Sequence, residues 1–411
     1  MSHRLILVPL CFFLTVPLGC RAKEVQDGES KEAAALFDAH RVIEVSVELA
    51  EEDWDTLRRQ ERSFVDVLGN LCTARQEEIF TFVPATVTID GTTLSDVGVR
   101  KKGFLGSLDT QRPSLKFSFD QYETTQRLHG LERFTVNNNK QDPSNVRQCL
   151  AYQTFADAGL PAPRCNFAHV TVNGRDLGIY THIEEIKKPF IRRHFSDDEG
   201  NLYEGVISDF TETGKLSFQQ KTNNEVPANR ADIDAVQAAL ADPSPGLAAR
   251  LDRLIDMDSF VRLWVMETVT SHWDGYASNH NNYYLYNDPD SGRFHFIPWG
   301  TDGAFATTNF VTSESSLVYS TGLIARLGYD DPEIRERYFS FFEEVLTQWD
   351  SEGMLTELDR MEALLQPFAD GSLARDIDEV RNFLQTYPAQ LLQRYQQQGA
   401  PHLQDGYDGC E

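Results

Sequence analysis

Side chains that could do chemistry gather in the segment SHWDGYASNHNNYYLY, residues 271–286, which holds one aspartate and three asparagines and ends in an apolar stretch. Asp274 is followed five residues later by Asn279, and Asp302-Gly303 follows the next expected hairpin. Phosphoryl transfer from a nucleotide needs a carboxylate near the attacking hydroxyl, and an asparagine and an aspartate on the metal that bridges the phosphates. Oxygen ligands of this kind suit Mg²⁺. The residue types and their order therefore predict a metal–nucleotide site.

Such a site also needs a cation that contacts the phosphates. Lys116 lies in the middle of an expected strand, with Leu115 and Phe117 on the opposite face. The segment KKGFLGS, residues 101–107, has the small residues of a loop that could cover the phosphates. Each part is weak by itself, because Asp-Gly is most often a turn and a lysine on the polar face of a strand is usually solvated. The prediction rests on the order of the parts along the chain.

Three other kinds of site are less well supported. A calcium-binding adhesion site could add Asp288 and Asp290, but both lie in NDPDSG, which is more simply a hairpin turn, and no EF-hand spacing is present. His272, His280 and His295 lack a regular metal-binding spacing. No Gly-x-Ser-x-Gly motif indicates a serine nucleophile.

The elements that must position these residues differ between the two halves of the chain. Before about residue 190, alternating apolar residues predict strands and one prominent helix, which begins after Pro143 with Ser144 as its cap and ends at Gly159. Helical spacing then dominates, around a hairpin at 282–299. Strands are expected at 41–48, 84–103, 113–120, 133–137 and 168–185, and helices at 51–60, 231–240, 246–255, 256–272 and within 331–398. The pattern predicts an α+β fold rather than a doubly wound sheet.

The composition argues against several classes of protein. The chain has 411 residues, of which 41% are hydrophobic, so it can form a sizeable core. Its formal net charge of −25 argues against binding nucleic acid or anionic lipid, because phosphates attract a basic face. The acidity mainly favours solubility.

The N-terminus indicates export. The apolar run at 5–20 is too short to span a bilayer comfortably and suits the core of a signal peptide. Small residues before Cys20 resemble the bacterial lipoprotein signal, in which that cysteine carries the lipid anchor, although Pro17 departs from the usual apolar residue; an ordinary signal peptide is the alternative. The polar residues 21–40 would then tether the domain. Arg21, where an aspartate would mark inner-membrane retention, favours the outer membrane or the cell surface.

Four cysteines follow the signal, an even number in an exported chain, so two disulfides are plausible. Three pairings are open. We favour Cys149–Cys165, with Cys72–Cys410 by elimination. No two of the four have the close spacing of a zinc knuckle.

Seven segments follow one another along the chain in a characteristic order: VGVRKKG, PSLKFSF, the stretch from RLHGLERFTV to GLPAPR, VTVNGRDLGIYTHIEE, GNLYEG, DGYASNHNNYYLY and FHFIPWGTDGAF. In this combination the sequence resembles the spore-coat CotH-type kinases, secreted or surface proteins with an atypical protein-kinase fold. The resemblance runs from about Val42 to Phe305. Its most specific parts are LPAP, NGRDLGIY, NNYYLY and IPW.

The resemblance implies a two-lobed kinase-like fold, with a β-rich N-terminal lobe at about 41–190 and a mainly helical C-terminal lobe at about 191–411. It implies phosphorylation of Ser or Thr in a protein outside the cytoplasm, with ATP and Mg²⁺ or Mn²⁺ as cofactors. On this view the only membrane contact is the lipid anchor at Cys20.

The same resemblance assigns roles to individual residues. Asp274 matches the catalytic-loop aspartate and would act on the substrate hydroxyl. Asn279 or Asn282, together with Asp302, would hold the metal. The residues expected to hold the nucleotide are Arg100 and Lys116 on the phosphates, and Glu184 and Glu185, at the end of YTHIEE, in the adenine pocket.

Two positions depart from the family pattern. The family commonly has Trp-Asp-x-Asp after Ile-Pro, whereas Gly300 follows Trp299 here, so one carboxylate is missing. A kinase usually pairs its strand lysine with a helix glutamate, and the helix after Pro143 offers only Gln148 near that place. Both changes are compatible with a weakened or inactive enzyme. The scarcity of ATP outside the cytoplasm favours the alternative of a non-catalytic module for binding or surface assembly, whereas the presence of Asp274, Asn279 and Asp302 favours the enzyme.

Overall fold

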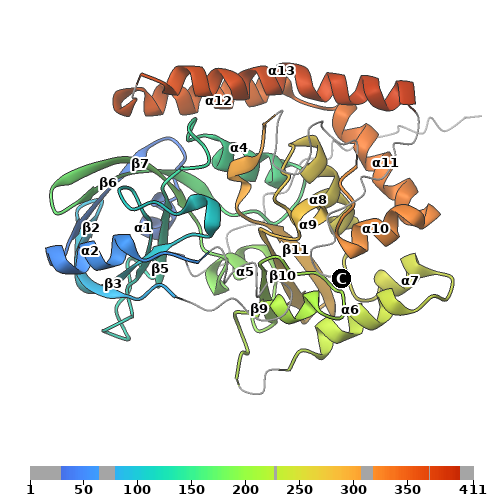
Figure 1. The fold of residues 1–411 in the computed structure, drawn as a ribbon, viewed down its shortest axis with the longest axis horizontal. Helices are drawn as coiled ribbons and strands as arrows, with labels where there is room; N and C mark the ends of the chain where they lie inside the picture. Colours follow the sequence, from blue (N-terminus) through green and yellow to red (C-terminus); the bar gives the residue numbers. More distant parts are fainter. Residues whose placement is uncertain (1–28, 64–78, 226–228, 307–317, 370, 399–411) are drawn as a thin grey trace, which may run out of the picture.

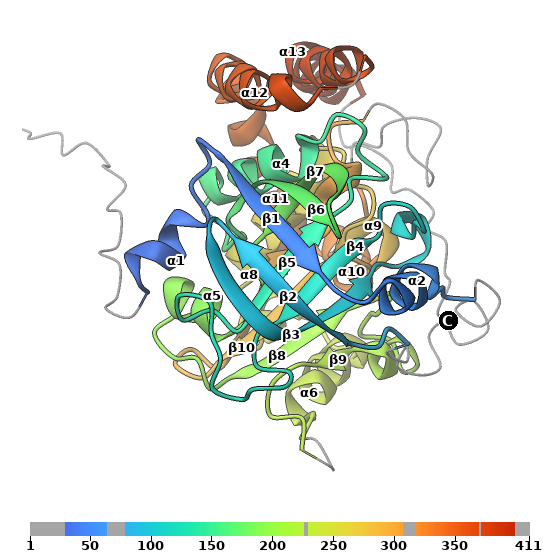
Figure 2. The same cartoon turned by 90° about the vertical axis from the view of Figure 1, so that its left-hand side faces the viewer.

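The first part of the chain forms a closed seven-stranded barrel in the computed structural model, which describes residues 29–63, 79–225, 229–306, 318–369 and 371–398. The order around the barrel is β1-β2-β3-β4-β5-β7-β6, and a parallel pairing of β1 with β6 closes it (Figures 1 and 2). The strands are β1 (Val42–Glu48), β2 (Val83–Ile89), β3 (Thr92–Lys102), β4 (Ser114–Ser118), β5 (Arg133–Asn137), β6 (Cys165–Val172) and β7 (Arg175–Ile183).

Alternation along the strands separates the interior of the barrel from its outer surface. Leu115 and Phe117 of β4 are fully buried inside, as their shared face predicted. Successive side chains on a strand point to opposite faces. Lys116, between them, therefore points outward, and it pairs in register with Arg100 of β3 and Thr135 of β5. The outer faces of β3, β4 and β5 thus form one continuous polar wall.

A short helix before the barrel, α1 (Lys31–Ala35), packs against it. Ala33 and Leu36 are buried, and the side-chain amide of Asn166 in β6 donates to the carbonyl oxygen of Leu36 at 2.9 Å. From Glu29 onward, the segment expected as a flexible tether is therefore packed structure, which corrects that prediction. The expected signal peptide lies outside the described residues.

The prominent helix of the first half, α4 (Arg147–Asp157), lies between the barrel and the rest of the molecule (Figure 1). Ser144 is not its cap, so that prediction is wrong. The carboxylate of Asp142 instead accepts the backbone N–H of Arg147 at 2.8 Å, and the Ser144 hydroxyl donates to the same carboxylate. The helix ends as expected before Gly159, whose φ of +84° suits a glycine.

A disulfide joins Cys149 of α4 to Cys165 at the start of β6, which confirms the favoured pairing. The two cysteines are 16 residues apart in the sequence, so the bridge closes a short loop and fixes α4 on the barrel. Cys72 and Cys410, the second expected pair, lie outside the described residues.

The second part of the chain combines a four-stranded sheet, in the order β11-β10-β8-β9, with helices. The β10–β11 hairpin turns at the expected NDPDSG, and α8 is capped by Asp256, whose carboxylate accepts the N–H of Ser259 at 3.0 Å. α12 and α13 lie side by side along one edge of the molecule (Figures 1 and 2). Besides the barrel strands, α1 and α4, the elements are α2 (Glu51–Arg59), η1 (Leu105–Ser107), α5 (Lys188–His194), β8 (Asn201–Gly205), η2 (Gly214–Ser217), β9 (Gln219–Gln220), α6 (Ala231–Ala241), α7 (Leu247–Leu251), α8 (Met257–Val269), α9 (Tyr276–Asn279), β10 (Tyr283–Asp288), β11 (Arg293–Pro298), η3 (Thr301–Gly303), α10 (Leu323–Asp330), α11 (Pro332–Thr347), α12 (Ser351–Leu365), η4 (Gln366–Phe368) and α13 (Leu373–Gln398).

The expected mixture of helices and strands is confirmed. Strands dominate up to residue 183 and helices dominate after it. The closure of the first sheet into a barrel was not predicted. Among the helices in the described ranges, none has both the length and the apolar character needed to cross a bilayer.

Removing the Cys149–Cys165 bridge should lower stability. Closing a loop of about 15 residues restricts the unfolded chain by an amount worth about 3 kcal/mol. We expect the double variant Cys149→Ala/Cys165→Ala to unfold at a lower urea concentration than the parent, with an equal or steeper dependence on urea because its unfolded chain is less compact. An unchanged unfolding midpoint would show that the bridge does not stabilise the fold.

Candidate functional site

A cavity of about 610 Å³ is lined by the polar wall of the barrel, α4, the second sheet and the segments on either side of the β10–β11 hairpin. It brings together residues that lie up to 240 positions apart in the sequence, from Arg62 to Asp302. Seven of the eight residues expected at the site line it, namely Arg100, Lys116, Glu185, Asp274, Asn279, Asn282 and Asp302. Glu184 is the exception.

The charge of this cavity contrasts with that of the whole chain. Six basic side chains and four acidic ones line it, whereas the chain carries a formal net charge of −25. The basic residues are Arg62, Arg100, Lys102, Lys116, Lys187 and Lys221, and the acidic residues are Glu185, Glu204, Asp274 and Asp302. Opposite charges arranged in this way suit a polyanion that is bound together with a cation.

A buried carboxylate beneath the cavity positions the loop that carries Asp274. Glu267, near the end of α8, is 1% exposed, and it accepts the backbone N–H groups of Tyr276 at 3.0 Å and Ala277 at 2.8 Å. These groups are orphan donors at the start of α9, where a negative charge is favourable. Burial, with a smaller contribution from Asp274, nevertheless raises the pKa of Glu267 to about 8. Sequence reasoning missed this residue, because its position inside a helix resembles that of any core-facing side chain.

Three asparagine side chains hold Asp274. The amide nitrogens of Asn279 and Asn282 donate to its two carboxylate oxygens at 2.5 and 2.6 Å, and that of Asn281 donates at 3.2 and 3.3 Å. Burial raises the pKa of Asp274 to about 6, although these three amides oppose the shift. Asn281 was not predicted, and the only signal for it was its place in the same asparagine-rich run.

Asp302 lies on the short helical turn η3, directly after β11. Burial raises its pKa to about 7, and the nearby carboxylates of Asp274 and Asp142 add to the shift. A hydrogen bond with the side chain of Gln148 opposes it. Two carboxylates therefore compete for the same partly desolvated space, and a cation between them would relieve the repulsion.

The donor set fits a hard divalent cation. Because the amide nitrogens of Asn279 and Asn282 are engaged with Asp274, the oxygens of those amides are left to bind a metal together with Asp302. Within the described ranges, no group of three or more histidine, cysteine, aspartate or glutamate residues could hold a metal ion. His272, His280 and His295, which the sequence did not favour as a zinc site, belong to no such group in this part of the chain, and a metal in the cavity would need amide oxygens.

The backbone at position 300, where the family pattern has an aspartate, leaves no room for a side chain. Gly300 has a φ of +53°, and a Cβ atom built on it would lie 2.5 Å from Cγ and Oδ1 of Asn282. No side chain fits there unless Asn282 moves. Asn282 thus reaches into the space next to the position where the family usually has an aspartate, and its amide nitrogen also lies 3.3 Å from the carbonyl oxygen of Gly300.

Helix α4 holds the segment that carries Asp302. The hydroxyl of Tyr152 accepts the backbone N–H of Gly300 at 3.0 Å, and the guanidinium of Arg147 donates to the carbonyl oxygen of Ala304 at 3.3 Å. The hydroxyl of Thr301 donates to the carbonyl oxygen of Gln148 at 3.4 Å. Asp302 is therefore fixed from both sides.

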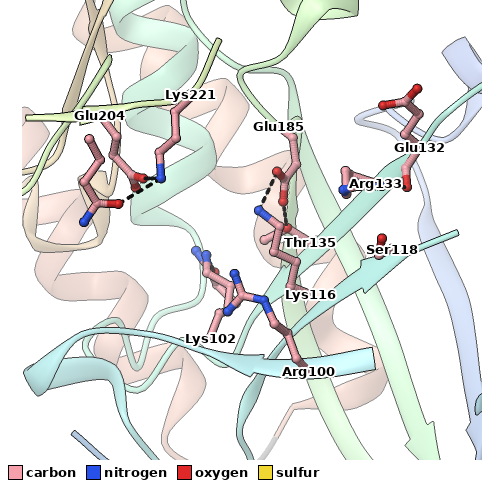
Figure 3. Close-up of polar contacts among 12 residues, drawn as sticks. Arg100, Lys102, Lys116, Ser118, Glu132, Arg133, Thr135, Glu185, Glu204 and Lys221 are labelled. Atoms are coloured by element: carbon pink, nitrogen blue, oxygen red, sulfur yellow. Dashed lines mark hydrogen bonds and ion pairs between the residues drawn. The ribbon is translucent and has the colours of Figure 1, made fainter. Parts of the chain in front are cut away.

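Lys116 is paired, although not with a helix residue. Its Nζ lies 2.8 Å from the carboxylate of Glu185, which follows β7, and the hydroxyl of Thr135 donates to the same carboxylate (Figure 3). Burial alone would raise the pKa of Glu185, but Lys116 and Thr135 together lower it to about 2. A second pair, Lys221 with Glu204, lies across the cavity (Figure 3).

Lys102 is the cavity lysine that sequence reasoning missed. It ends β3, two residues after Arg100 on the same face, and the two side chains turn into the same space (Figure 3). Its Nζ donates to Oδ1 of Asn137 at 2.6 Å and lies 5.6 Å from the centre of the Trp299 ring. The available signal was the alternation of VRKKG, which places Arg100 and Lys102 on one side and Lys101 on the other.

Glu184 lies outside the cavity lining. It is 4% exposed, it forms ion pairs with Arg164 and Arg193, and it accepts the backbone N–H of Arg164 at 3.0 Å. Its contacts are those of a structural residue. The alternative calcium residues also have a structural explanation, because the carboxylate of Asp288 accepts the N–H of Asp290 at 3.2 Å, within the expected turn.

Comparison with known proteins gives a family match and several relatives. The family model described as CotH kinase protein matches residues 99–397. The inner spore coat protein H of Bacillus subtilis is 24% identical over 235 residues, which cover 54% of this chain and 62% of that protein. The inner spore coat protein H-like protein of the same species is 24% identical, over 69% of this chain and 89% of the relative. The invasin CotH2 of Rhizopus delemar is 24% identical, over 44% and 33%.

The chain thus spans less than two thirds of the length of two of these three relatives. Among solved structures, the Helicobacter pylori proinflammatory kinase CtkA aligns with 70% of this chain and 95% of its own, at 9% identity and a TM-score of 0.31. That likeness is too low to establish a common fold.

Neutralising Asp302 should change the pH dependence of stability. Its pKa rises from 3.8 to about 7 in the folded protein, so the folded state binds the proton more tightly than the unfolded state, and stability falls as pH rises through this window. We expect Asp302→Asn to melt at a higher temperature than the parent at pH 8 and at nearly the same temperature at pH 4.

The same experiment tests the metal site without any measurement of activity. Excess Mg²⁺ at pH 8 should raise the melting temperature of the parent but not that of Asp302→Asn. The exposed Asp96→Asn serves as the control for removal of a surface carboxylate. A stability difference between Asp302→Asn and the parent that stays constant from pH 4 to pH 8 would contradict the prediction.

Proposed function

The chain belongs to the CotH kinase family, and we propose that it is an exported, ATP- and metal-dependent protein kinase that phosphorylates Ser or Thr of a protein outside the cytoplasm. The observation that carries the proposal is the arrangement of Asp274 and Asp302 in a cavity otherwise rich in basic side chains. We propose further that the barrel is the N-terminal lobe of a two-lobed kinase-like fold and that the helical part is its C-terminal lobe.

In this proposal Asp274 is the general base. The acceptor hydroxyl oxygen attacks the γ-phosphorus of ATP, the bond from that phosphorus to the bridging oxygen of the β-phosphate breaks, ADP leaves, and the hydroxyl proton passes to Asp274. A carboxylate with a pKa of about 6 is ionised at neutral pH and still accepts a proton readily. Its three amide donors hold both oxygens in place, so the carboxylate is oriented before substrate arrives.

The remaining residues bind and orient the nucleotide. Asp302 and the amide oxygens of Asn279 and Asn282 would hold Mg²⁺ or Mn²⁺, which would neutralise charge on the phosphates when bound. The basic wall of β3 and β4 would face the phosphate oxygens, with Arg100 and Lys116 paired side by side across the two strands. The loop after β3, which lines the cavity from Gly103 to Ser107, would cover them.

Location and partner belong to the same proposal. Export through the N-terminal apolar run, with a lipid at Cys20, would place the domain at the outer membrane or the cell surface, and the substrate would be an envelope or secreted protein. The support is the sequence of the N-terminal segment together with the disulfide between Cys149 and Cys165, which suits an oxidising compartment.

A non-catalytic module for binding or surface assembly is the second candidate. It is favoured by Gly300, where a carboxylate of the family pattern is missing, and by Gln148 on α4, where a kinase has a glutamate. The basic cavity would then serve to hold an anionic group without transfer.

Transfer of the γ-phosphate of ATP by the whole mature protein, with Mg²⁺ or Mn²⁺, decides between these candidates. Transfer to the chain itself or to an added envelope protein supports the kinase. Metal-dependent nucleotide binding without any transfer supports the binding module. No nucleotide binding with either metal would contradict the kinase proposal.

Asp274→Asn and Asp302→Ala should separate the two acidic roles. Asp274→Asn removes the base but keeps the shape, so transfer should fall by about 100-fold or more while nucleotide binding persists. Asp302→Ala should abolish metal-dependent binding itself. Asp96→Asn is the control. Equal loss of nucleotide binding in both variants would contradict the assignment of Asp274 as the base.

A further inference from the structure

A pair of uncharged side chains connects β5, the strand before α4, to α4 itself. Asn137, at the end of β5, donates from its side-chain amide to Oε1 of Gln148 at 3.0 Å. Protein kinases join a strand to this helix through a lysine and a glutamate. Here the two partners are both amides, so neither supplies the positive charge that phosphates require.

Lys102, at the end of β3 in the same polar wall, supplies that positive charge. Its Nζ donates to Oδ1 of Asn137, whose amide nitrogen donates to Oε1 of Gln148, and the side chain of Gln148 in turn favours the ionised form of Asp302. Two hydrogen bonds therefore join a lysine of the barrel to Gln148 of α4, whose side chain acts on the acidic residue of η3. We propose that Lys102 is the principal phosphate-binding cation of the cavity, and that Asn137 and Gln148 position it relative to Asp302.

The partners of the two lysines favour Lys102 over Lys116 for this role. Lys116 is held by the carboxylate of Glu185 at 2.8 Å, and both side chains are largely shielded, with 23% and 12% of their surfaces exposed. A phosphate would have to compete with that carboxylate. The partner of Lys102 is the neutral oxygen of Asn137, and no carboxylate in the described ranges lies within ion-pair distance of its Nζ. Its charge is oriented but not neutralised.

The location of Lys102 fits the same role. It directly precedes the Gly103–Ser107 loop, and its ammonium group faces the ring of Trp299, the residue before Gly300 and two residues from η3. Burial lowers the pKa of Lys102 to about 8, while Glu185, Glu204 and Asp302 favour its charge and Lys116 opposes it. A bound polyphosphate would compensate for the lost hydration of the ammonium group.

The inference deepens the proposed kinase function and rests on it, but it can be tested separately with inorganic tripolyphosphate and Mg²⁺, which contain no nucleoside and no transferable acceptor. Binding is measured calorimetrically for the parent, Lys102→Met, Lys102→Arg and the double variant Lys116→Gln/Glu185→Gln. The double variant replaces the charged pair by two amides, so that no unpaired charge is left behind.

We expect Lys102→Met to lose about tenfold or more in tripolyphosphate affinity, since a hydrogen bond to a charged group contributes about 1.5–3 kcal/mol. Lys102→Arg should retain most of the affinity, which guards against a fold defect in the methionine variant. It should also keep that affinity above pH 8, where the parent loses it. The double variant at Lys116 and Glu185 should lose less than Lys102→Met.

The opposite ranking would overturn the inference, as would parent-like affinity in Lys102→Met or a parent that does not bind tripolyphosphate. Failure of the kinase proposal is a different result, namely tripolyphosphate binding that depends on Lys102 without transfer from ATP. The two failures can therefore be told apart.

The positioning role of Gln148 has its own test. Gln148→Met preserves volume but removes the hydrogen bond to Asn137 and the polar group that favours the ionised form of Asp302. Outer partners of metal ligands typically affect metal affinity by about tenfold or more, so the half-saturating Mg²⁺ concentration for tripolyphosphate binding should rise by about that factor. A lower melting temperature with an unchanged Mg²⁺ requirement would show that Gln148 is merely structural.

Discussion

The closeness of two aspartates in a partly desolvated cavity is the constraint on which the rest of the site depends. Burial raises the pKa of Asp274 to about 6, and burial together with repulsion from Asp274 and Asp142 raises the pKa of Asp302 to about 7. The side chains that favour the ionised forms of these two carboxylates are amides. Amides orient a carboxylate without neutralising it, whereas an arginine or lysine would cancel its charge. The negative potential that a metal cation needs is therefore preserved.

Two helices hold this arrangement in place. Glu267 of α8 fixes the start of α9 from below, and thereby the loop that presents Asp274. Tyr152 and Arg147 of α4 fix the segment around Asp302. The disulfide at Cys149 then ties α4 to the barrel, so the acidic residues of the second part keep a defined position relative to the basic wall of the first part.

That the acidic residues line one cavity could be predicted from the sequence, because these residues are local to one another. Asp274 and its asparagines lie within eight residues, and a single hairpin brings the chain to Asp302. The basic half depends on pairings between distant strands, and the parallel closure of β1 on β6 has no local signal. Glu184 and Glu185 show a further limit of prediction from the sequence, which could not tell which of two adjacent side chains faces the cavity. Adjacent side chains at the end of a strand point to opposite sides, so only one of them could line the cavity.

Both departures from the family pattern act on the same electrostatic balance. A glutamate in place of Gln148 would put a further carboxylate where a neutral amide now favours the ionised form of Asp302, and an aspartate in place of Gly300 would put another beside Asn282. Each added charge would raise the pKa of the existing acids further, unless more cations were bound. The loss of both carboxylates leaves a site with fewer negative charges, each held by amides. Their absence therefore changes the charge that the cavity must balance, and does not by itself indicate an inactive protein.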